Sequence, residues 1–422
     1  MKLHDLKKQI QEYQYFEDTK VIDVTLASII SNRLKVSNPV WLILIGASSG
    51  GKSQIINPVA SSDPQFIHRI DDITENTFLS GAKSKGGENE TSFLLREDGL
   101  GAHGIISISD LTILLSKNSE SRAVILSQFR ALFDGFMTKH SGNMKKPLVW
   151  QGYAGIIAGS TPSVYETFEE FSDLGERFIY YRMKDFNRAK ATNLALTRTL
   201  YGKELNDRLS ELYGQYVKEL TVKYKEEDHP ELTPEVRERI IRIANFSETV
   251  RTPVKKDWRG EHVTRIPCTA YPMRVALQLE GIAKTLMIMR HNEEGVWDLK
   301  EEDLSVLDWI GYSLANEEKR ACLKILASVA WEESLSTQAL ADEIGLNTDV
   351  VNAYVQNLSA VGVVRRRGES GELRWCFKNK NDYDLVRRIE QIEGEVEYED
   401  REPTHEELKQ SEELQNQNFD NM

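Results

Sequence analysis

The stretch of residues 40–53, VWLILIGASSGGKS, constrains what this chain can fold into more than any other. It begins with apolar residues, rich in β-branched and aromatic side chains, that predict a short buried strand. A loop of glycine and serine follows at once and fills every fixed place of the pattern G-x-x-x-x-G-K-[ST]. A strand that enters such a loop and leaves it as a helix predicts an α/β domain in which the loop cradles phosphate.

The residue types of this loop match the chemistry of a nucleoside triphosphate and its magnesium ion. Glycines let backbone N–H groups approach the phosphates closely, Lys52 reaches the β and γ oxygens, and the Ser53 hydroxyl holds Mg²⁺. The following helix points its positive end at the same anion. The residues expected to contact the nucleotide are Gly46, Ala47, Ser48, Ser49, Gly50, Gly51, Lys52 and Ser53.

A carboxylate beside the phosphates is the second requirement of such a site. The stretch GAHGIISISD predicts a buried strand that ends in Asp110. An acid there can hold Mg²⁺ or orient the attacking water. The stretch YAGIIAGSTP predicts a further buried strand, and its polar end, with Thr161, would lie near the γ-phosphate if that strand lies beside the loop strand.

The predicted elements divide the chain into five parts. Residues 1–36 form an N-terminal helical segment, 37–187 an α/β core, 188–316 a helical subdomain, 317–380 a winged-helix domain and 381–422 an acidic tail. Within the core, residues 66–73 predict a strand, and the polar run 83–90 predicts a hairpin insertion between flanking strands. Amphipathic patterns predict helices over 123–136 and 189–225.

Two groups of basic residues are candidates for contact with DNA. The first is the tip of a predicted hairpin, MTKHSGNMKKPLVWQG, for which a solvated basic turn is the competing interpretation. The second is the wing of the winged helix-turn-helix, a fold that binds nucleic acid or docks proteins. The candidate residues are Lys139, His140, Lys145 and Lys146 in the hairpin, and Arg365, Arg366 and Arg367 in the wing.

The charge of the chain does not exclude DNA as a partner. The chain has 422 residues and a net charge of −13, but residues 390–422 hold twelve acidic side chains against two basic ones. The acidity therefore belongs mostly to a stretch rich in Glu, Gln and Asn, which predicts a disordered tail. The three cysteines lack a metal-ligand spacing. Without a signal peptide or an apolar run of about 18 residues, the sequence predicts a cytoplasmic protein that does not enter a membrane.

The order of these parts resembles the AAA+ ATPases and, among them, the minichromosome-maintenance-like (MCM-like) replicative helicases of phages and mobile genetic elements. The match covers residues 39–379, and its sharpest segment is TFLSGAKSKGGENETSFLLREDGLGAHGIISISDL, which is similar to the family's second-strand insertion and Walker B strand. The motifs TP, ERF and YPMRVALQLEGIAK resemble sensor 1, the arginine finger and the sensor-2 helix. This resemblance assigns Thr161, Arg177 and Arg274 to those three roles.

The resemblance implies an AAA+ core with a helical lid that binds ATP and Mg²⁺ in a ring, usually a homo-hexamer. Lys52, Ser53, Asp110 and Thr161 would act on one face of the nucleotide, while Arg177 and Arg274 would come from the neighbouring subunit. The hairpin lysines would line a pore that holds single-stranded DNA. The sequence departs from the family pattern at three residues: Ser109 stands in place of the magnesium-associated Asp, Asp110 in place of the catalytic Glu, and Thr161 in place of Asn.

The sequence thus predicts an ATP hydrolase that acts as a motor on DNA, with an MCM-like replicative helicase as the best match. Two rival hypotheses stay open. One is a helicase loader or replication initiator, which would use ATP to assemble on DNA or to hand over another ring to replication partner proteins. The other is a DNA-binding ATPase switch in regulation or defence.

Overall fold

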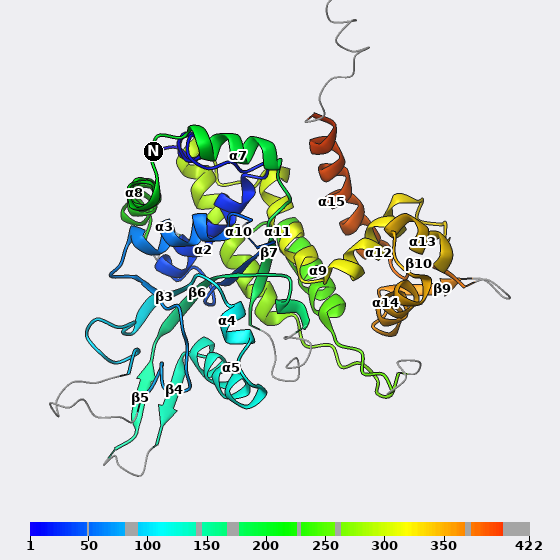
Figure 1. The fold of residues 1–422 in the computed structure, drawn as a ribbon, viewed down its shortest axis with the longest axis horizontal. Helices are drawn as coiled ribbons and strands as arrows, with labels where there is room; N and C mark the ends of the chain where they lie inside the picture. Colours follow the sequence, from blue (N-terminus) through cyan, green and yellow to red (C-terminus); the bar gives the residue numbers. More distant parts are fainter. Residues whose placement is uncertain are drawn as a thin grey trace, which may run out of the picture.

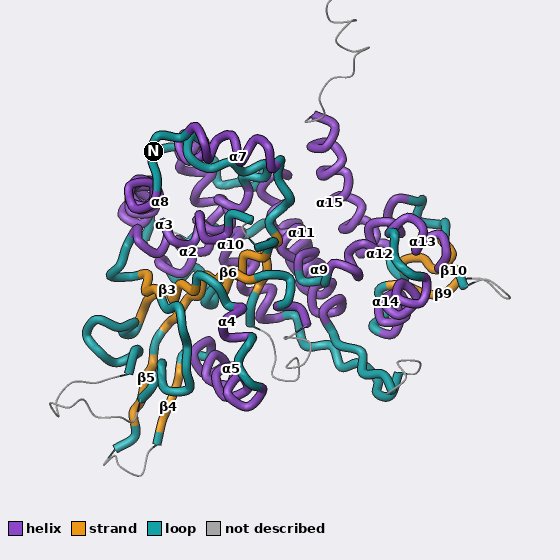
Figure 2. The backbone as a smooth tube through the Cα atoms, in the orientation of Figure 1, coloured by secondary structure: helices purple, strands orange, loops and turns teal. Residues whose placement is uncertain are grey.

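A parallel β-sheet lies at the centre of the molecule (Figures 1 and 2). The computed structural model describes residues 1–48, 50–80, 92–140, 146–166, 177–225, 229–257, 263–367 and 373–399, with side chains up to residue 391. Within these residues the sheet has five strands in the order β2-β3-β6-β1-β7. The strands are β1 (Trp41–Ile45), β2 (Ile67–Arg69), β3 (His103–Ile108), β6 (Tyr153–Ser160) and β7 (Ile179–Arg182). The predicted mixed α/β fold is confirmed.

Strand β1 lies inside the sheet, as its continuous apolar run predicts. It pairs in parallel with β6 on one side, where Trp41 is opposite Ile156, and with β7 on the other, where Leu42 is opposite Ile179. Every residue of β1 is buried. A strand covered on both faces has no polar face to present, which explains why its sequence does not alternate. The carboxyl ends of all five strands of the described sheet meet at one edge.

Helices cover the sheet and form a bundle beside it (Figure 1). Helix α2 packs on α10 and α8, α3 packs on α8, and α11 packs on β7. None of the helices among the described residues is both long and apolar enough to cross a membrane. The helices of this part are α1 (Leu3–Gln11), α2 (Lys20–Leu34), α3 (Lys52–Ser62), α4 (Thr112–Leu115), α5 (Ser119–Phe133), α7 (Arg188–Thr197), α8 (Gly202–Lys223), α9 (Pro234–Arg251), α10 (Met273–Glu294) and α11 (Glu301–Ser313).

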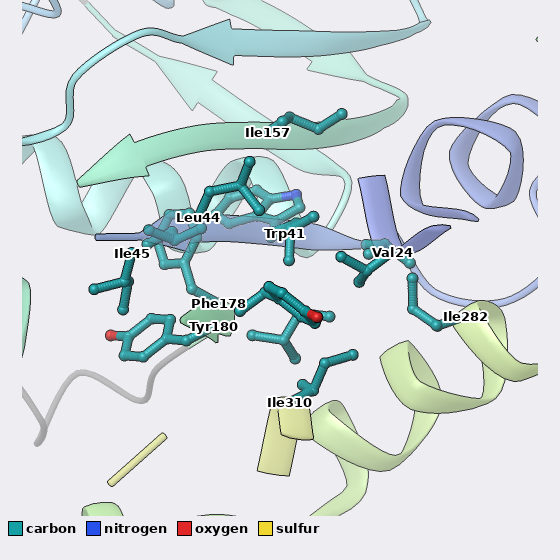
Figure 3. Packing of buried hydrophobic residues seen from close by; sticks show 14 of the residues in the cluster. Val24, Trp41, Leu44, Ile45, Ile157, Phe178, Tyr180, Ile282 and Ile310 are labelled. Atoms are coloured by element: carbon teal, nitrogen blue, oxygen red, sulfur yellow. The ribbon is translucent and has the colours of Figure 1, made fainter. Parts of the chain in front are cut away.

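The side chain of Trp41 is a centre of the core. Its ring meets Phe129 and Phe133 edge-on, with centroids 5.7 and 5.2 Å away. Its indole N–H donates to Ala154 O at 2.7 Å, so the polar atom of this fully buried side chain is satisfied. Figure 3 shows the neighbouring side chains of β1 between Ile157 on one side and Tyr180 on the other. This packing fixes the strand from which the glycine-rich loop departs.

Several elements differ from their predicted bounds, for local reasons. The helix expected over 123–136 is α5, which begins after the Asn118 cap and ends before Gly135, whose φ is +76°. The helix expected over 189–225 is two helices, α7 and α8. The strands expected beside 83–90 are absent from the described flanks, which form turns, and residues 81–91 lie outside the described residues. The predicted hairpin is present as β4 (Phe136–Lys139) and β5 (Leu148–Gln151).

The C-terminal part has the predicted order of three helices and two strands, with one short strand added. Strand β10 pairs with β9 and β8, all antiparallel. Ser336 and Asn347 cap the second and third helices through their side chains. The elements are α12 (Glu317–Ser328), β8 (Leu335–Ser336), α13 (Thr337–Ile344), α14 (Thr348–Ala360), β9 (Val364–Arg367) and β10 (Arg374–Phe377).

The acidic tail predicted from residue 381 differs from the structure in its first part. Helix α15 covers Lys380–Glu399 and packs against α9, α11 and α12. Its apolar side chains Leu385, Val386 and Ile389 are buried, and Arg388 Nε lies 3.5 Å from the buried Asp308 Oδ2 of α11. The apolar residues of this helix recur on one face within a strongly charged stretch. The net charge of the stretch predicted disorder because it does not report this spacing. Residues 400–422 of the predicted tail lie outside the described residues.

Helix α15 is therefore expected to stabilise the body of the protein. We predict that Leu385→Ala, which empties a position only 3% exposed, lowers the free energy of unfolding by about 2–5 kcal/mol. Gln391→Ala is the matched control, because Gln391 is exposed and lies two residues after the buried Ile389. Its free energy of unfolding should stay within about 0.5 kcal/mol of that of the unchanged protein. Chemical denaturation of the full chain measures both. Equal stability of the two variants would show that α15 does not contribute to the fold.

Candidate functional site

The glycine-rich loop lies at the carboxyl edge of the sheet, between β1 and α3. Gly51 has φ +82°, a conformation that glycine adopts without strain, and a Cβ on Gly50 would stand 2.9 Å from Ala47 O. Both positions thus require glycine for the chain to turn tightly into α3. Ser49 lies outside the described residues; Ala47, Ser48 and Ser53 are exposed. The described residues of the loop thus turn tightly into α3 and leave Ala47, Ser48 and Ser53 open to solvent.

Lys52 stands at the first position of α3 and turns back over this loop. Its Nζ donates to Gly46 O at 2.7 Å and to Ala47 O at 2.6 Å. The side chain is 8% exposed. Burial lowers the pKa of Lys52, and the nearby Asp110 carboxylate acts in the opposite direction. The ammonium group is thus held at the mouth of the loop by two neutral carbonyls, which a phosphate oxygen can replace with a stronger, charge-assisted bond.

Asp110 and Thr161 follow neighbouring strands and meet at the same edge. Asp110 Oδ1 accepts from Thr112 N at 2.9 Å, while Thr161 Oγ1 lies 2.7 Å from Ser163 Oγ and 3.5 Å from Thr112 Oγ1. Strand β6 separates β3 from β1, so Asp110 stands two strand spacings, about 10 Å, from the glycine-rich loop. That interval has room for a terminal phosphate and a water molecule. The structure thus brings Lys52, Asp110 and Thr161 together, as predicted.

A group of polar residues beside Asp110 was not predicted. Ser109 Oγ lies 3.1 Å from Asp71 Oδ1 and 3.2 Å from Asn57 Oδ1. Asp71 follows β2 and Asn57 belongs to α3, the helix that begins at the loop. The signal in the sequence was the pair of aspartates in RIDDIT, at the end of a predicted strand.

A cavity of about 570 Å³ opens beside the glycine-rich loop. Its volume is in the range of small-molecule pockets. Besides the loop it is lined by two segments distant in sequence, residues 13–15 before α2 and residues 183–198, which include α7. The aromatic side chains of this wall are Tyr13, Tyr15 and Phe186. No periodicity or motif marks these residues, because they meet the loop only through the tertiary fold.

Gln14 connects one wall of the cavity to α3, the helix that begins at the glycine-rich loop. Pro58 lies inside α3 and has no N–H, so it cannot donate to the carbonyl of Gln54 four residues earlier. Gln14 Nε2 donates to that carbonyl instead, at 2.6 Å, and the side chain of Gln14 is 2% exposed. The segment before α2 thus supplies a hydrogen bond that the helix lacks.

The two candidate arginines lie at the opposite edge of the sheet from Lys52. Arg177 stands just before β7, and Gln278 of α10 donates through Nε2 to Arg177 O at 2.9 Å. Arg274 lies one turn earlier on α10 and is exposed. Burial lowers the pKa of Arg177, as do the nearby Arg274 and Arg130, while its hydrogen bond to Asp134 opposes them. The structure therefore brings Arg177 and Arg274 together and separates both from the loop of the same chain.

The guanidinium of Arg177 is occupied within its own chain. It lies 3.1 Å from Asp134 Oδ2 and over the ring of Phe133, and its side chain is 6% exposed. Asp134 itself is more than half exposed. A buried cation with an exposed acidic partner can exchange that partner for another anion if the side chain is drawn outward.

The predicted basic residues have unequal surroundings. Lys139 is held by the body, because its Nζ donates to Asn76 Oδ1 and to Leu79 O, both at 2.7 Å. His140 and Lys146 are exposed, and Lys145 lies outside the described residues. In strand β9, Arg365, Arg366 and Arg367 are exposed, and Arg367 donates to Glu332 O. The candidate residues exposed to solvent therefore include His140 and Lys146 in the hairpin, and Arg365 and Arg366 in β9.

A bound metal would depend on the nucleotide for most of its ligands. Among the described residues, no group of three or more His, Cys, Asp or Glu side chains could hold a metal ion alone. Ser53 and Asp110, the two predicted metal residues, supply oxygen atoms, which is the ligand type that Mg²⁺ prefers. Mg²⁺ in nucleotide sites takes its other ligands from phosphates and water.

Comparison of the chain with protein-family models gave no match, and comparison with curated protein sequences gave none.

Proposed function

We propose that this protein is an ATP-binding AAA+ motor that hydrolyses ATP to act on DNA, of the MCM-like helicase type. The observation that carries the proposal is the convergence of Lys52, Asp110 and Thr161 on one edge of the sheet, beside a glycine-rich loop that opens on a cavity. Lys52 begins the helix after β1, while Asp110 and Thr161 follow β3 and β6, and this arrangement supports phosphoryl transfer as the chemistry of the site.

The residues present fit a nucleoside triphosphate and its magnesium ion. Gly50 and Gly51 leave the loop free of Cβ atoms that would block a phosphate. Lys52 would bind the β and γ oxygens, Ser53 would hold Mg²⁺, and Asp110 would orient the attacking water. Thr161 would donate its hydroxyl to the γ-phosphate. The bound Mg²⁺ supplies positive charge that offsets the charge of the transferring phosphoryl group.

The remainder of the cavity suits the nucleoside. Tyr13, Tyr15 and Phe186 line it beside apolar side chains of α7. Aromatic rings give a purine base flat apolar surface on which to stack. Helix α7 belongs to the helical part after the core, which corresponds to the lid in the proposed architecture. Closure of such a lid would exclude water from the phosphates.

The positions of the arginines support an active site shared between subunits. Strand β1 has five residues, so its two ends are about 17 Å apart. Arg177 and Arg274 lie near the amino end of the sheet and the loop lies near its carboxyl end. They would therefore serve the nucleotide of a neighbouring copy. Contacts of this head-to-tail kind form rings when the rotation between copies closes, and a ring of this kind is the proposed homo-hexamer.

Two parts of the surface support DNA as the partner. The β4–β5 hairpin extends away from the sheet and carries His140 and Lys146 near its tip (Figure 1). The proposed winged-helix domain presents exposed arginines on β9, and Asn352, Tyr354 and Gln356 are partly exposed on α14. Cations on a projecting ribbon suit a phosphate backbone, and polar side chains on a helix suit base edges.

The test of this function is the steady-state rate of ATP hydrolysis alone, with single-stranded DNA and with duplex DNA. A translocating motor predicts strong stimulation by single-stranded DNA, followed by strand displacement. Turnover without displacement, together with binding to a separate replicative helicase, would favour the loader or initiator. Specific binding of one duplex sequence, with a rate indifferent to single-stranded DNA, would favour the switch. No hydrolysis under any condition would contradict all three.

The hairpin tip gives a separate prediction for DNA binding. We expect the double variant Lys145→Ala with Lys146→Ala to weaken DNA affinity and to lower the slope of log affinity against log salt by about one unit for each phosphate that the variant no longer neutralises. Lys139→Ala is the matched control, because Lys139 is bonded to the body and should change stability rather than the salt slope. Fluorescence anisotropy over a salt series measures both. An unchanged slope in the double variant would show that the tip is a solvated turn.

A further inference from the structure

A second carboxylate reaches the edge of the candidate site from strand β2. Asp71 lies two residues beyond the end of β2, which pairs in parallel with β3. In this pairing Arg69 is opposite Ser107, and Ile70 N donates to Ser107 O at 2.9 Å. The same register continued by two residues places Asp71 opposite Ser109. The side chains of Asp71 and Ser109 therefore leave the sheet at the same level.

The hydrogen bonds around Ser109 form a chain from α3 to Asp71. Ser109 Oγ lies 3.1 Å from Asp71 Oδ1 and 3.2 Å from Asn57 Oδ1. A hydroxyl has one proton to donate and a carboxylate only accepts, so Ser109 donates to Asp71. With the Asn57 amide turned over, its Nδ2 donates to Ser109 Oγ and all three groups are satisfied.

This chain lies directly beside the phosphate-binding elements. Asn57 follows Ser53 by one turn of α3, on the same face of the helix. A Cβ on Gly159 would stand 2.7 Å from Ser109 O and 3.7 Å from Lys52 Cβ. Gly159 therefore lies between the backbone of Ser109 and the side chain of the loop lysine, with Ile56 of α3 packed against the same position. The negative charge of Asp71, transmitted by its hydrogen bond with Ser109, would therefore act on the region where the metal and the phosphates would bind.

We propose that Asp71 is a positioning residue of this site and that it acts through Ser109 to supply the negative charge that the chain lacks at position 109. The inference rests on the proposed function. Ser109 donates its hydrogen bond to the carboxylate, which makes Oγ a stronger acceptor, and the lone pair that Asn57 does not use would accept from a water molecule of bound Mg²⁺. Outer partners of this kind commonly change metal affinity by about 10–100-fold. Asp71 also accepts from Arg69 Nε, at 2.9 and 3.1 Å, and its two oxygens have capacity for both partners.

The test is the Mg²⁺ concentration required for ATP to stabilise the protein against heat, which needs no turnover. Asp71→Asn is expected to raise the half-maximal Mg²⁺ concentration by about tenfold, the lower end of the effect of outer metal partners. Asp72→Asn is the matched control: it removes the adjacent carboxylate, whose Oδ1 lies 2.8 Å from Lys117 Nζ, and should leave the requirement unchanged. A requirement in Asp71→Asn within about twofold of the unchanged protein would overturn the inference.

Two more variants separate charge from structure. Arg69→Gln removes the ion pair of Asp71 but keeps the carboxylate, so the Mg²⁺ requirement should stay at its original value. Ser109→Asp places an acid directly at the position concerned and is expected to restore the original requirement when combined with Asp71→Asn. Failure of this rescue, or an effect of Arg69→Gln equal to that of Asp71→Asn, would show that Asp71 serves only the structural ion pair with Arg69.

The unchanged protein distinguishes a failure of this inference from a failure of the proposed function. Stabilisation by ATP that depends on Mg²⁺ and is lost in Lys52→Ala is expected if the loop binds nucleotide. Its absence at every Mg²⁺ concentration would overturn the proposed function, and the role of Asp71 with it. Its presence with equal behaviour of Asp71→Asn and Asp72→Asn would overturn the role of Asp71 alone.

Discussion

Replacement of Lys52 by alanine is expected to lower the rate of ATP hydrolysis by at least about 100-fold, the usual effect of removing one group that stabilises charge in a transition state. The lysine is 8% exposed and already turned over the glycine-rich loop, where Gly46 O and Ala47 O hold its ammonium group. An alanine leaves the β and γ oxygens without that charge. Phosphate release over time, with Mg²⁺ and saturating ATP, measures the rate.

Two controls make this prediction specific to the site. Lys203→Ala removes an exposed lysine of α8 and should hydrolyse ATP at the original rate. The unfolding temperature of Lys52→Ala without nucleotide should stay close to that of the unchanged protein, because the two carbonyls released are at an exposed loop. A variant that folds normally and retains its rate would disprove the assignment of the loop.

The second large effect is expected at Arg177, on the other edge of the sheet. Arg177→Ala should lower hydrolysis by about 10³-fold while ATP binding is retained, because an arginine supplied in trans stabilises the transition state and contributes little to binding before it. Asp134→Ala is the matched control. It breaks the same ion pair, 3.1 Å long, but keeps the arginine, so its rate should remain near the original. Equal reductions of the rate in both variants would show that the pair serves the fold alone.

Mixing two inactive variants tests whether the site is shared. Each Arg177→Ala subunit has an intact loop, and each Lys52→Ala subunit has an intact arginine. An interface that joins the loop of the first to the arginine of the second is complete, so a mixture should regain hydrolysis that neither variant has alone. Titration of one variant into the other at fixed total protein measures this recovery. Hydrolysis by Arg177→Ala alone at the original rate would contradict a role for the arginine in trans.

Strand β1 was predictable because two independent features of the sequence mark it, its continuous apolar run and the loop pattern that follows. Residues 41–45 are apolar without alternation, which only a strand covered on both faces needs, and the loop that follows has a fixed chemical pattern. The strand before Asp110 was also predicted, although β3 ends at Ile108, two residues earlier than the predicted end at Asp110. The sequence therefore indicated that Lys52 and Asp110 follow buried strands, whereas the position of Thr161 depended on the pairing of β6 with β1, which only the structure shows.

The parts that could not be predicted depend on contacts between distant segments. Asp71 is a polar residue after a strand of three residues, and its relation to Ser109 follows only from the pairing of β2 with β3. Tyr13 and Tyr15 reach the cavity from a loop without periodicity. In α15, an excess of acidic side chains concealed the apolar face that holds Leu385 and Val386 in the core. Composition averages over a segment, whereas packing depends on one face of it.

The proline inside α3 has a consequence for how the two ends of the site communicate. Pro58 leaves the Gln54 carbonyl open, and Gln14 completes it from the segment that also forms the cavity wall. Under the proposed function, a nucleotide that shifted α3 would change the free energy of the contact with Gln14, and a displacement of Gln14 would change the free energy of α3. Binding linkage is reciprocal, so both changes alter affinity by the same factor. If the loop binds nucleotide as proposed, the segment of residues 12–19 between α1 and α2 is thus a part of the chain whose position would alter the affinity of the loop for its ligand.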